Sequence, residues 1–237
     1  MPTFDNTIKN GLQNIKMEDF FYIKKISASQ FGNVHMIRDN YGNFYALKSY
    51  NKAELIEYEV QKFINEEKKI LDTIAFPFII ELGKVFQTEA NLYFITEFIS
   101  GENFYDVIKD IGLLSTEDSQ FYAASIILIL EYLQENFIVC RDIKPENFMI
   151  DTWGYLKLIN LEISKTIRSE NNQISKTFTI IGTPHYMAPD IILGKGYNNL
   201  VDLWSLGICL YEFLCGVLPF GDSSEGPYDI YEEIMQS

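Results

Sequence analysis

A carboxylate, an ammonium group and an amide lie close together in the stretch Cys140-Arg141-Asp142-Ile143-Lys144-Pro145-Glu146-Asn147. Asp142 could accept a proton, Lys144 could neutralise phosphate charge, and the amide of Asn147 could offer an oxygen to a cation. The stretch therefore combines a possible proton acceptor with groups that could hold an anion and a cation. Thirteen positions after Asn147 the sequence reads Asn160-Leu161-Glu162, with an amide where a hard cation would favour a carboxylate.

Composition excludes several broad classes of protein. The chain has 237 residues, enough for one large domain or two lobes, and its 47% hydrophobic and 22% charged residues are ordinary for a globular protein. A formal net charge of -14 argues against a general surface for nucleic acid or anionic membranes. The same charge suits cationic partners such as Lys- and Arg-rich peptides, although acidity that only aids solubility explains it as well.

The cysteines and the N-terminus are those expected of a cytoplasmic protein. Cys140, Cys209 and Cys215 form no C-x-x-C pair, so we expect neither a disulfide framework nor a zinc site. The first residues lack a basic region followed by an apolar run, so no signal peptide is expected. The most apolar run, Ala123 to Leu130, is too short to span a bilayer.

The pattern of expected elements changes near Ser100-Gly101. Strands and one Glu- and Lys-rich helix predominate before that point, and mainly helices follow it. The capping signal Ser115-Thr116-Glu117-Asp118 predicts the start of a buried helix. The expected elements are strands at 20–34, 43–49, 78–86, 91–98, 148–151 and 155–159, helices at 53–72, 116–133 and 201–215, a lead-in at 1–18 and a mobile polar loop at 166–180. This order predicts a bilobal α+β protein.

The stretch from Cys140 to Asn147 resembles the catalytic loop of protein kinases, H-R-D-L-K-P-E-N. Further motifs follow in the family's order from about residue 20. The sequence is most similar to AGC-group Ser/Thr protein kinases, and within them to the cyclic-nucleotide-dependent enzymes. The resemblance implies a lead-in at 1–18, a β-rich small lobe with one main helix at 19–99 and a helical large lobe at 100–237. It also implies that the family's last large-lobe helices are missing after Ser237, which would mark a fragment or leave an apolar surface for a partner.

Several residues of the small lobe are implied to bind ATP. Lys48, in Tyr45-Ala46-Leu47-Lys48, would grip the α- and β-phosphates and form an ion pair with Glu67. The glycine-rich loop is degraded to Ser27-Ala28-Ser29-Gln30-Phe31-Gly32, which would close less tightly over phosphates. The full implied set is Ser27, Gly32, Val34, Ala46, Lys48, Glu67, Glu97, Ile99 and Met149, with Thr96 as the gatekeeper before the hinge. Plain core packing explains the apolar members equally well.

The catalytic loop keeps the family's reacting groups. The resemblance implies that Asp142 accepts or orients the substrate hydroxyl, that Lys144 neutralises the γ-phosphate and that Asn147 binds Mg²⁺. Arg141 would face a phosphate on Thr179, the implied phosphosite of the activation loop. That loop, which contains Ser169 to Asn172, looks longer than in similar kinases.

The second metal position departs from the family. Asn160 replaces the Asp of D-F-G, so Mg²⁺ binding is expected to be weakened. Loss of one such electrostatic group costs a reaction roughly a hundredfold to a thousandfold in rate. Glu162 replaces the Gly of the motif, and its spacing along an expected strand points its side chain away from the metal.

The resemblance also implies where a peptide substrate binds. Glu146 and Glu212 match carboxylates that bind Arg in basophilic kinases, and Thr183 belongs to the same substrate-binding set. A basic protein or peptide is therefore the expected substrate or pseudosubstrate, and a regulatory protein partner is a further expectation. Asp202 is expected to hydrogen-bond the backbone of the catalytic loop. Asp190 replaces the Glu of A-P-E, and its shorter side chain is expected to miss the family's Arg.

Two functions follow from this sequence. The first is a Ser/Thr protein kinase-like domain that binds ATP but has impaired or lost phosphoryl transfer, a pseudokinase. The second is an active AGC-type Ser/Thr kinase with reduced or unusual metal dependence. Asn160, Glu162 and the lost glycines favour the first, whereas Lys48 and Asp142 are the residues that the second requires.

Overall fold

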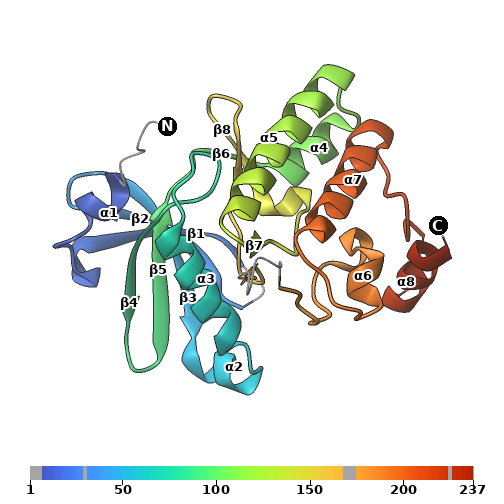
Figure 1. The fold of residues 1–237 in the computed structure, drawn as a ribbon. Coiled ribbons are helices and arrows are strands. Elements are labelled where there is room, and N and C mark those ends of the chain that lie inside the picture. Colours follow the sequence, from blue (N-terminus) through green and yellow to red (C-terminus); the bar gives the residue numbers. More distant parts are fainter. Residues whose placement is uncertain (1–6, 29–30, 168–174, 224–225, 237) are drawn as a thin grey trace. The chain divides into compact units, whose positions relative to one another are not determined.

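The computed structural model describes residues 7–28, 31–167, 175–223 and 226–236. By their internal contacts the residues divide into two units, Met1–Ser100 and Gly101–Ser237. The first is built on a β-sheet and the second is mainly helical (Figure 1). Each unit is described by itself below.

A five-stranded antiparallel sheet in the order β1-β2-β3-β5-β4 forms the first unit. Its strands are β1 (Phe20–Ala28), β2 (Asn33–Asp39), β3 (Phe44–Asn51), β4 (Leu82–Gln87) and β5 (Asn91–Glu97), and its helical segments are α1 (Thr7–Gly11), η1 (Met17–Asp19), α2 (Lys52–Glu57) and α3 (Gln61–Thr73). Alternate residues of β3 face opposite sides of this sheet, so Lys48 and Tyr50 share one face while Tyr45 and Leu47 share the other.

Three predicted elements of this unit were wrong in extent. The strand predicted at 20–34 is two antiparallel strands, β1 and β2, because the chain reverses between Ala28 and Asn33. The helix predicted at 53–72 is two helices, because Glu59 has a left-handed φ of 55° that no helix continues. The strand predicted at 78–86 begins only at Leu82.

The lead-in at 1–18 was predicted without structure, but its described part packs on the sheet. Leu12 is fully buried in a cluster with Ile37, Tyr45, Leu47 and Ile95. The segment α1 lies against β4 (Figure 1), where Gly83 leaves room for it because a Cβ there would stand 2.6 Å from Leu12 Cδ1. The signal was visible in the apolar spacing of Ile8, Leu12 and Ile15.

Lys84 of β4 binds the end of this N-terminal segment through hydrogen bonds. Its ammonium donates to the carbonyl oxygens of Leu12, Gln13 and Ile15 at 2.9, 2.9 and 2.7 Å. The Leu12 carbonyl also accepts the N–H of Ile15 at 3.3 Å, so Lys84 adds a charged donor to the turn that follows α1.

The second unit packs helices around two small sheets. Its helical segments are α4 (Phe104–Ile111), α5 (Thr116–Glu135), η2 (Pro145–Asn147), η3 (Pro184–Tyr186), α6 (Pro189–Ile192), α7 (Leu200–Cys215) and α8 (Pro227–Gln236). Its strands are β6 (Gly101–Asn103), β7 (Ile138–Val139), β8 (Phe148–Asp151), β9 (Leu156–Leu158) and β10 (Lys165–Thr166), in the sheet orders β6-β8-β9 and β10-β7.

The predicted elements of this unit match the structure well. The helix start at Ser115 is confirmed, since its hydroxyl accepts from the Asp118 N–H at 3.0 Å. Helix α7 and strand β8 fall where the sequence predicted them, and β9 is one residue shorter than predicted at each end. No described helix is both long enough and apolar enough to cross a membrane.

The polar segment 166–180 is only partly described. The predicted long insertion at Ser169 to Asn172 lies outside the described residues. Thr177 is buried and forms an isolated β-bridge with Tyr197, and the mobility that the sequence predicted for this segment stays a prediction.

Candidate active site

The first group of candidate residues lies on β3 and α3. The predicted ion pair is present, with Lys48 Nζ 3.0 Å from Glu67 Oε1. The other carboxylate oxygen of Glu67 accepts a 2.8 Å hydrogen bond from the hydroxyl of Tyr50. Both Glu67 and Tyr50 are buried, so this carboxylate is held by a cation and a hydroxyl out of contact with water.

Gly32 is the one glycine retained in the degraded glycine-rich loop, and local packing explains why it is a glycine. A Cβ on Gly32 would stand 2.2 Å from the carbonyl oxygen of Ser49, so the packing of β2 on β3 requires glycine there whether or not phosphate binds. Ser27 is exposed and pairs with Val34 across the β1–β2 hairpin. Ser29, the second lost glycine, lies outside the described residues.

The remaining small-unit candidates lie along β5 and its neighbours. Ala46 pairs with Thr96, which is buried and donates from its hydroxyl to the Glu97 carbonyl at 3.3 Å. The Glu97 carboxylate accepts the N–H of Glu81 at 2.8 Å, and Ile99 is buried. These placements are compatible with a hinge, and equally with packing of the unit.

In the second unit, the catalytic-loop candidates form one hydrogen-bonded network. Asp142 Oδ1 accepts from the hydroxyl of Thr183, and Oδ2 accepts from the Asn147 amide, both at 2.7 Å. Lys144 Nζ donates to Thr183 Oγ1 at 2.7 Å and lies 3.3 Å from Asp142 Oδ2. Thr183, predicted from resemblance to bind substrate, therefore lies directly against the predicted base.

The backbone of this loop is strained and anchored. Arg141 has a left-handed φ of 67°. The predicted role of Asp202 is confirmed, because its two carboxylate oxygens accept the N–H groups of Cys140 and Arg141, each at 2.8 Å. Burial raises the pKa of Asp202 to about 6, although both N–H groups favour its charged form. Burial likewise raises the pKa of the Cys140 thiol, so this thiol stays protonated.

The two metal candidates contact each other directly. The amide of Asn160 donates to Asn147 Oδ1 at 3.1 Å, while Asn160 Oδ1 accepts the N–H of Glu162 at 3.2 Å. The oxygen that Asn147 would offer to a cation thus already accepts an N–H. Glu162 is buried in a turn and not on a strand, which corrects the sequence prediction. Asn147 and Asn160 fit Mg²⁺ poorly, because both side chains are neutral amides and a hard cation favours negatively charged carboxylate ligands.

The guanidinium of Arg141 has one buried nitrogen that makes no hydrogen bond to the described residues. Its Nε donates to the Ile163 carbonyl at 2.6 Å, while Nη1 is buried and has no hydrogen-bond partner among the residues that the structure describes. Thr179 is exposed, and its carbonyl accepts from the Tyr197 hydroxyl.

The predicted substrate carboxylates influence each other. Glu146 is exposed on η2, and Glu212 on α7 accepts a 2.7 Å hydrogen bond from the Tyr186 hydroxyl. Burial raises the pKa of Glu212, the bond from Tyr186 opposes that shift, and repulsion by Glu146 adds to it. A cation bound beside both carboxylates would relieve this repulsion.

Comparison with known proteins decides the family. Residues 20–237 match the family described as "Protein kinase domain". The chain belongs to the protein kinase family. The cGMP-dependent protein kinase of Plasmodium berghei is 41% identical over 232 residues, which cover 98% of this chain and 26% of that protein.

Other relatives of this kinase-family chain extend the comparison. The cGMP-dependent protein kinase of Toxoplasma gondii is 40% identical over 93% of this chain and 22% of its own length. The cAMP-dependent protein kinase catalytic subunit of Arthrobotrys oligospora is 34% identical over 98% of this chain and 44% of its own length. The predicted resemblance to cyclic-nucleotide-dependent kinases and the bilobal kinase fold are therefore confirmed. The chain spans less than half the length of these relatives.

Two candidates stand apart from the networks above. Met149 lies in β8, where it pairs with Asn103 and Lys157. Asp190 lies in the first turn of α6 and is exposed.

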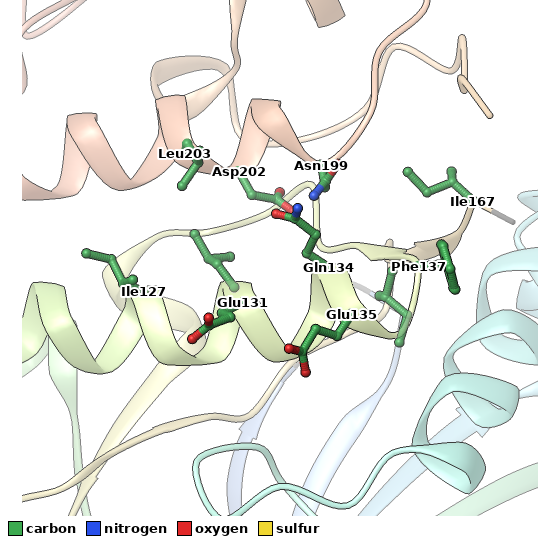
Figure 2. Close-up of a pocket in the computed structure, with 11 residues that line it drawn as sticks. Ile127, Glu131, Gln134, Glu135, Phe137, Ile167, Asn199, Asp202 and Leu203 are labelled. Carbon is green, nitrogen blue, oxygen red and sulfur yellow. The ribbon is translucent and has the colours of Figure 1, made fainter. Parts of the chain in front are cut away.

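A cavity of about 560 Å³ lies between α5 and α7 of the kinase-family chain (Figure 2). Its wall includes Ile127, Leu203 and Phe137, with the carboxylates of Glu131 and Glu135 beside them. Asp202 also lines it, but its carboxylate is engaged by the catalytic-loop backbone. The predicted metal and proton-transfer residues are not among the described residues that line this cavity, so it is no substitute for the site around Asp142.

Sequence reasoning missed two hydroxyls that hold candidate carboxylates. Tyr50 contacts Glu67 and Tyr186 contacts Glu212. The first could have been found, because residues two apart on a strand share a face and Tyr50 follows Lys48 by two. No sequence signal connects Tyr186 with Glu212.

Proposed function

We propose that this kinase-family chain binds ATP through Lys48 and transfers its phosphoryl group to proteins slowly or not at all. One observation carries this proposal, the hydrogen bond from Asn160 Nδ2 to Asn147 Oδ1 at 3.1 Å. The amide occupies the oxygen on which a metal would depend, and it adds no negative charge. Transfer would then lack the metal that neutralises charge developing on the phosphates.

Nucleotide binding is supported by the Lys48–Glu67 pair. Glu67 is 2% exposed and Lys48 has 13% of its side chain exposed, so the pair is largely desolvated. Breaking a buried pair leaves an uncompensated charge, and a retained pair points to a phosphate-binding ammonium held in a defined position. Gly32 lends no support, because β-sheet packing alone requires it.

The catalytic loop supports the second function, a slow but active Ser/Thr kinase. Asp142 keeps a carboxylate that could accept the proton of a substrate hydroxyl, and Lys144 could neutralise the phosphate that is transferred. Asp142 is held by hydrogen bonds from Thr183 and Asn147, and Lys144 by its bond to Thr183. This preformed network would allow residual transfer.

We expect ATP to raise the melting temperature of the protein by the same amount with and without Mg²⁺, because the phosphates are held by Lys48 and not through a metal. Lys48→Met should remove most of the shift. Thermal unfolding with ATP, with and without EDTA, measures this. If ATP raised the melting temperature only when Mg²⁺ is present, the proposal that the metal site is lost would be contradicted. If ATP raised it in neither condition, the proposal that the chain binds ATP would be contradicted.

A phosphotransfer assay separates the two functions. Incorporation of phosphate into a basic peptide would be compared with the Asp142→Asn variant as the blank. Incorporation well above the blank favours the active kinase, whereas equal incorporation favours the pseudokinase.

The same proposal includes a phosphorylated activation segment. A phosphate on Thr179 would bring about two negative charges and three strong acceptors to the segment. The buried Nη1 of Arg141 offers a donor for it, and Thr179 is exposed to a modifying enzyme.

The proposed substrate or pseudosubstrate is a protein or peptide with Lys or Arg near the acceptor. Glu146 and Glu212 support it, since burial, and to a lesser degree repulsion by Glu146, raises the pKa of Glu212, and a bound cation would offset that repulsion. A regulatory protein partner stays a prediction. We also propose an intracellular location, supported by the three free cysteines, of which Cys140 and Cys209 are buried.

Binding of a basic peptide should strengthen as pH rises through the raised pKa of Glu212, because only the ionised carboxylate attracts a cation. We expect roughly a threefold to tenfold gain in affinity, typical of a partly exposed charge pair. Fluorescence anisotropy with an Arg-containing peptide across mildly acidic to neutral pH measures it. In Glu212→Gln the pH dependence should flatten, and an unchanged slope there would assign it to another group.

A further inference from the structure

Tyr50 holds a position from which it can orient the ion pair next to it. It follows Lys48 by two residues on β3, so the two side chains lie on the same face of the sheet. Its ring is fully buried and packs edge-to-face on Phe94, with centroids 5.4 Å apart. A Cβ on Gly32 would stand 3.1 Å from the Tyr50 ring, which shows how closely the backbone just before β2 approaches this ring.

The hydroxyl and the ring of Tyr50 engage both members of the pair. The hydroxyl donates to Glu67 Oε2 at 2.8 Å while Oε1 faces Lys48 at 3.0 Å. The ammonium of Lys48 also lies 5.6 Å from the centre of the Tyr50 ring, within the range of a cation–π contact. A carboxylate held at both oxygens cannot rotate without breaking a charge-assisted hydrogen bond in a buried site.

We propose that Tyr50 is a positioning residue, which fixes the carboxylate of Glu67 so that Lys48 stays aimed at the nucleotide phosphates. The inference deepens the proposed function, since the consequence for nucleotide rests on ATP binding by Lys48. The hydrogen bond from Tyr50 to Glu67 and the ion pair of Glu67 with Lys48 belong to the folded first unit, and they do not require nucleotide.

The same strand provides a matched control. Tyr45 is also a buried tyrosine of β3, and its hydroxyl donates to the carboxylate of Asp39 at 3.1 Å. Its side chain belongs to the cluster on the opposite face of the sheet, with Leu12 and Leu47. Tyr45→Phe therefore removes one buried hydroxyl–carboxylate bond from the same strand without touching the pair of Lys48 and Glu67.

The first measurement is the Kd for ATP of the full chain by calorimetry, at a temperature where every variant is folded. Tyr50→Phe should raise the Kd by about threefold to tenfold, the effect of a mispositioned phosphate ligand. Tyr45→Phe should leave it unchanged even if it lowers the melting temperature as much. In a Lys48→Met background, Tyr50→Phe should have no further effect on the Kd.

The second measurement does not depend on nucleotide. A double-mutant cycle with Lys48→Met and Glu67→Gln gives the coupling between the pair from unfolding curves, and it is repeated with Tyr50→Phe and with Tyr45→Phe. The coupling should fall by at least half with Tyr50→Phe and persist with Tyr45→Phe. If the unaltered chain binds no ATP, the proposed function fails, and this cycle alone decides the role of Tyr50. Equal coupling and equal ATP affinity in the two tyrosine variants would overturn the inference.

Discussion

Replacing Asn160 with Asp should raise phosphoryl transfer to a basic peptide by about a hundredfold to a thousandfold in the presence of Mg²⁺. The amide of Asn160 now donates to Asn147 Oδ1 and accepts the N–H of Glu162. A carboxylate could still accept that N–H, and it would replace the NH₂ group beside Asn147 Oδ1 with a negatively charged oxygen that suits a hard cation. A radiometric transfer assay with and without EDTA measures the gain, with Asp142→Asn in the same background as the blank.

The stability of this variant gives a second measurement that needs no activity. Without metal, Asn160→Asp loses its bond to Asn147 and places a negative charge near Asp142, so its melting temperature should fall. Mg²⁺ should restore it, whereas the unaltered protein should not respond. Asn160→Ala separates loss of the bond from gain of charge, because it should be less stable without responding to Mg²⁺. No rise in rate and no metal response in Asn160→Asp would place the defect elsewhere.

Replacing Asp202 with Ala should lower the free energy of unfolding by about 3 kcal/mol. Two N–H donors, of Cys140 and Arg141, would lose their buried acceptor, and the left-handed backbone at Arg141 would lose its anchor. Chemical denaturation measures the change. Any residual transfer activity should fall with it, since Arg141 precedes Asp142.

Two comparisons identify the cause of that loss. Asp202→Asn keeps one acceptor but sets an N–H against an N–H, so it should lie between the Ala variant and the unaltered protein. Asp222 is exposed, and Asp222→Ala should change stability by no more than about 0.5 kcal/mol. Equal stability of the Ala variants at 202 and 222 would show that the two N–H bonds contribute little.

The sequence predicted the large unit better than the sheet. Ser115 and the apolar run of α7 are local signals, and local hydrogen bonds form the helices that they predict. The break at Glu59 depends on a single backbone conformation, and a continuous helical pattern conceals it. The reversal between β1 and β2 was hidden because the degraded glycine loop had lost its strongest turn residues.

The candidate site shows the same division. The Lys48–Glu67 pair and the bonds of Asp202 could be predicted because their partners have fixed places in the family's motifs. The sequence showed that Asn160 lacks charge, but not that its amide would bond to Asn147. That bond depends on side-chain orientation, which residue types and spacing do not determine.

The buried position of Leu12 shows that the folded first unit begins earlier in the chain than the match to the family. The family's sequence signature begins at residue 20, yet the apolar side of the sheet is closed by residues from before it. A protein trimmed to the signature would uncover Ile37, Leu47 and Ile95 and leave Lys84 without its three carbonyls. A stable form of this chain should therefore include residues before position 20, where the match to the family begins.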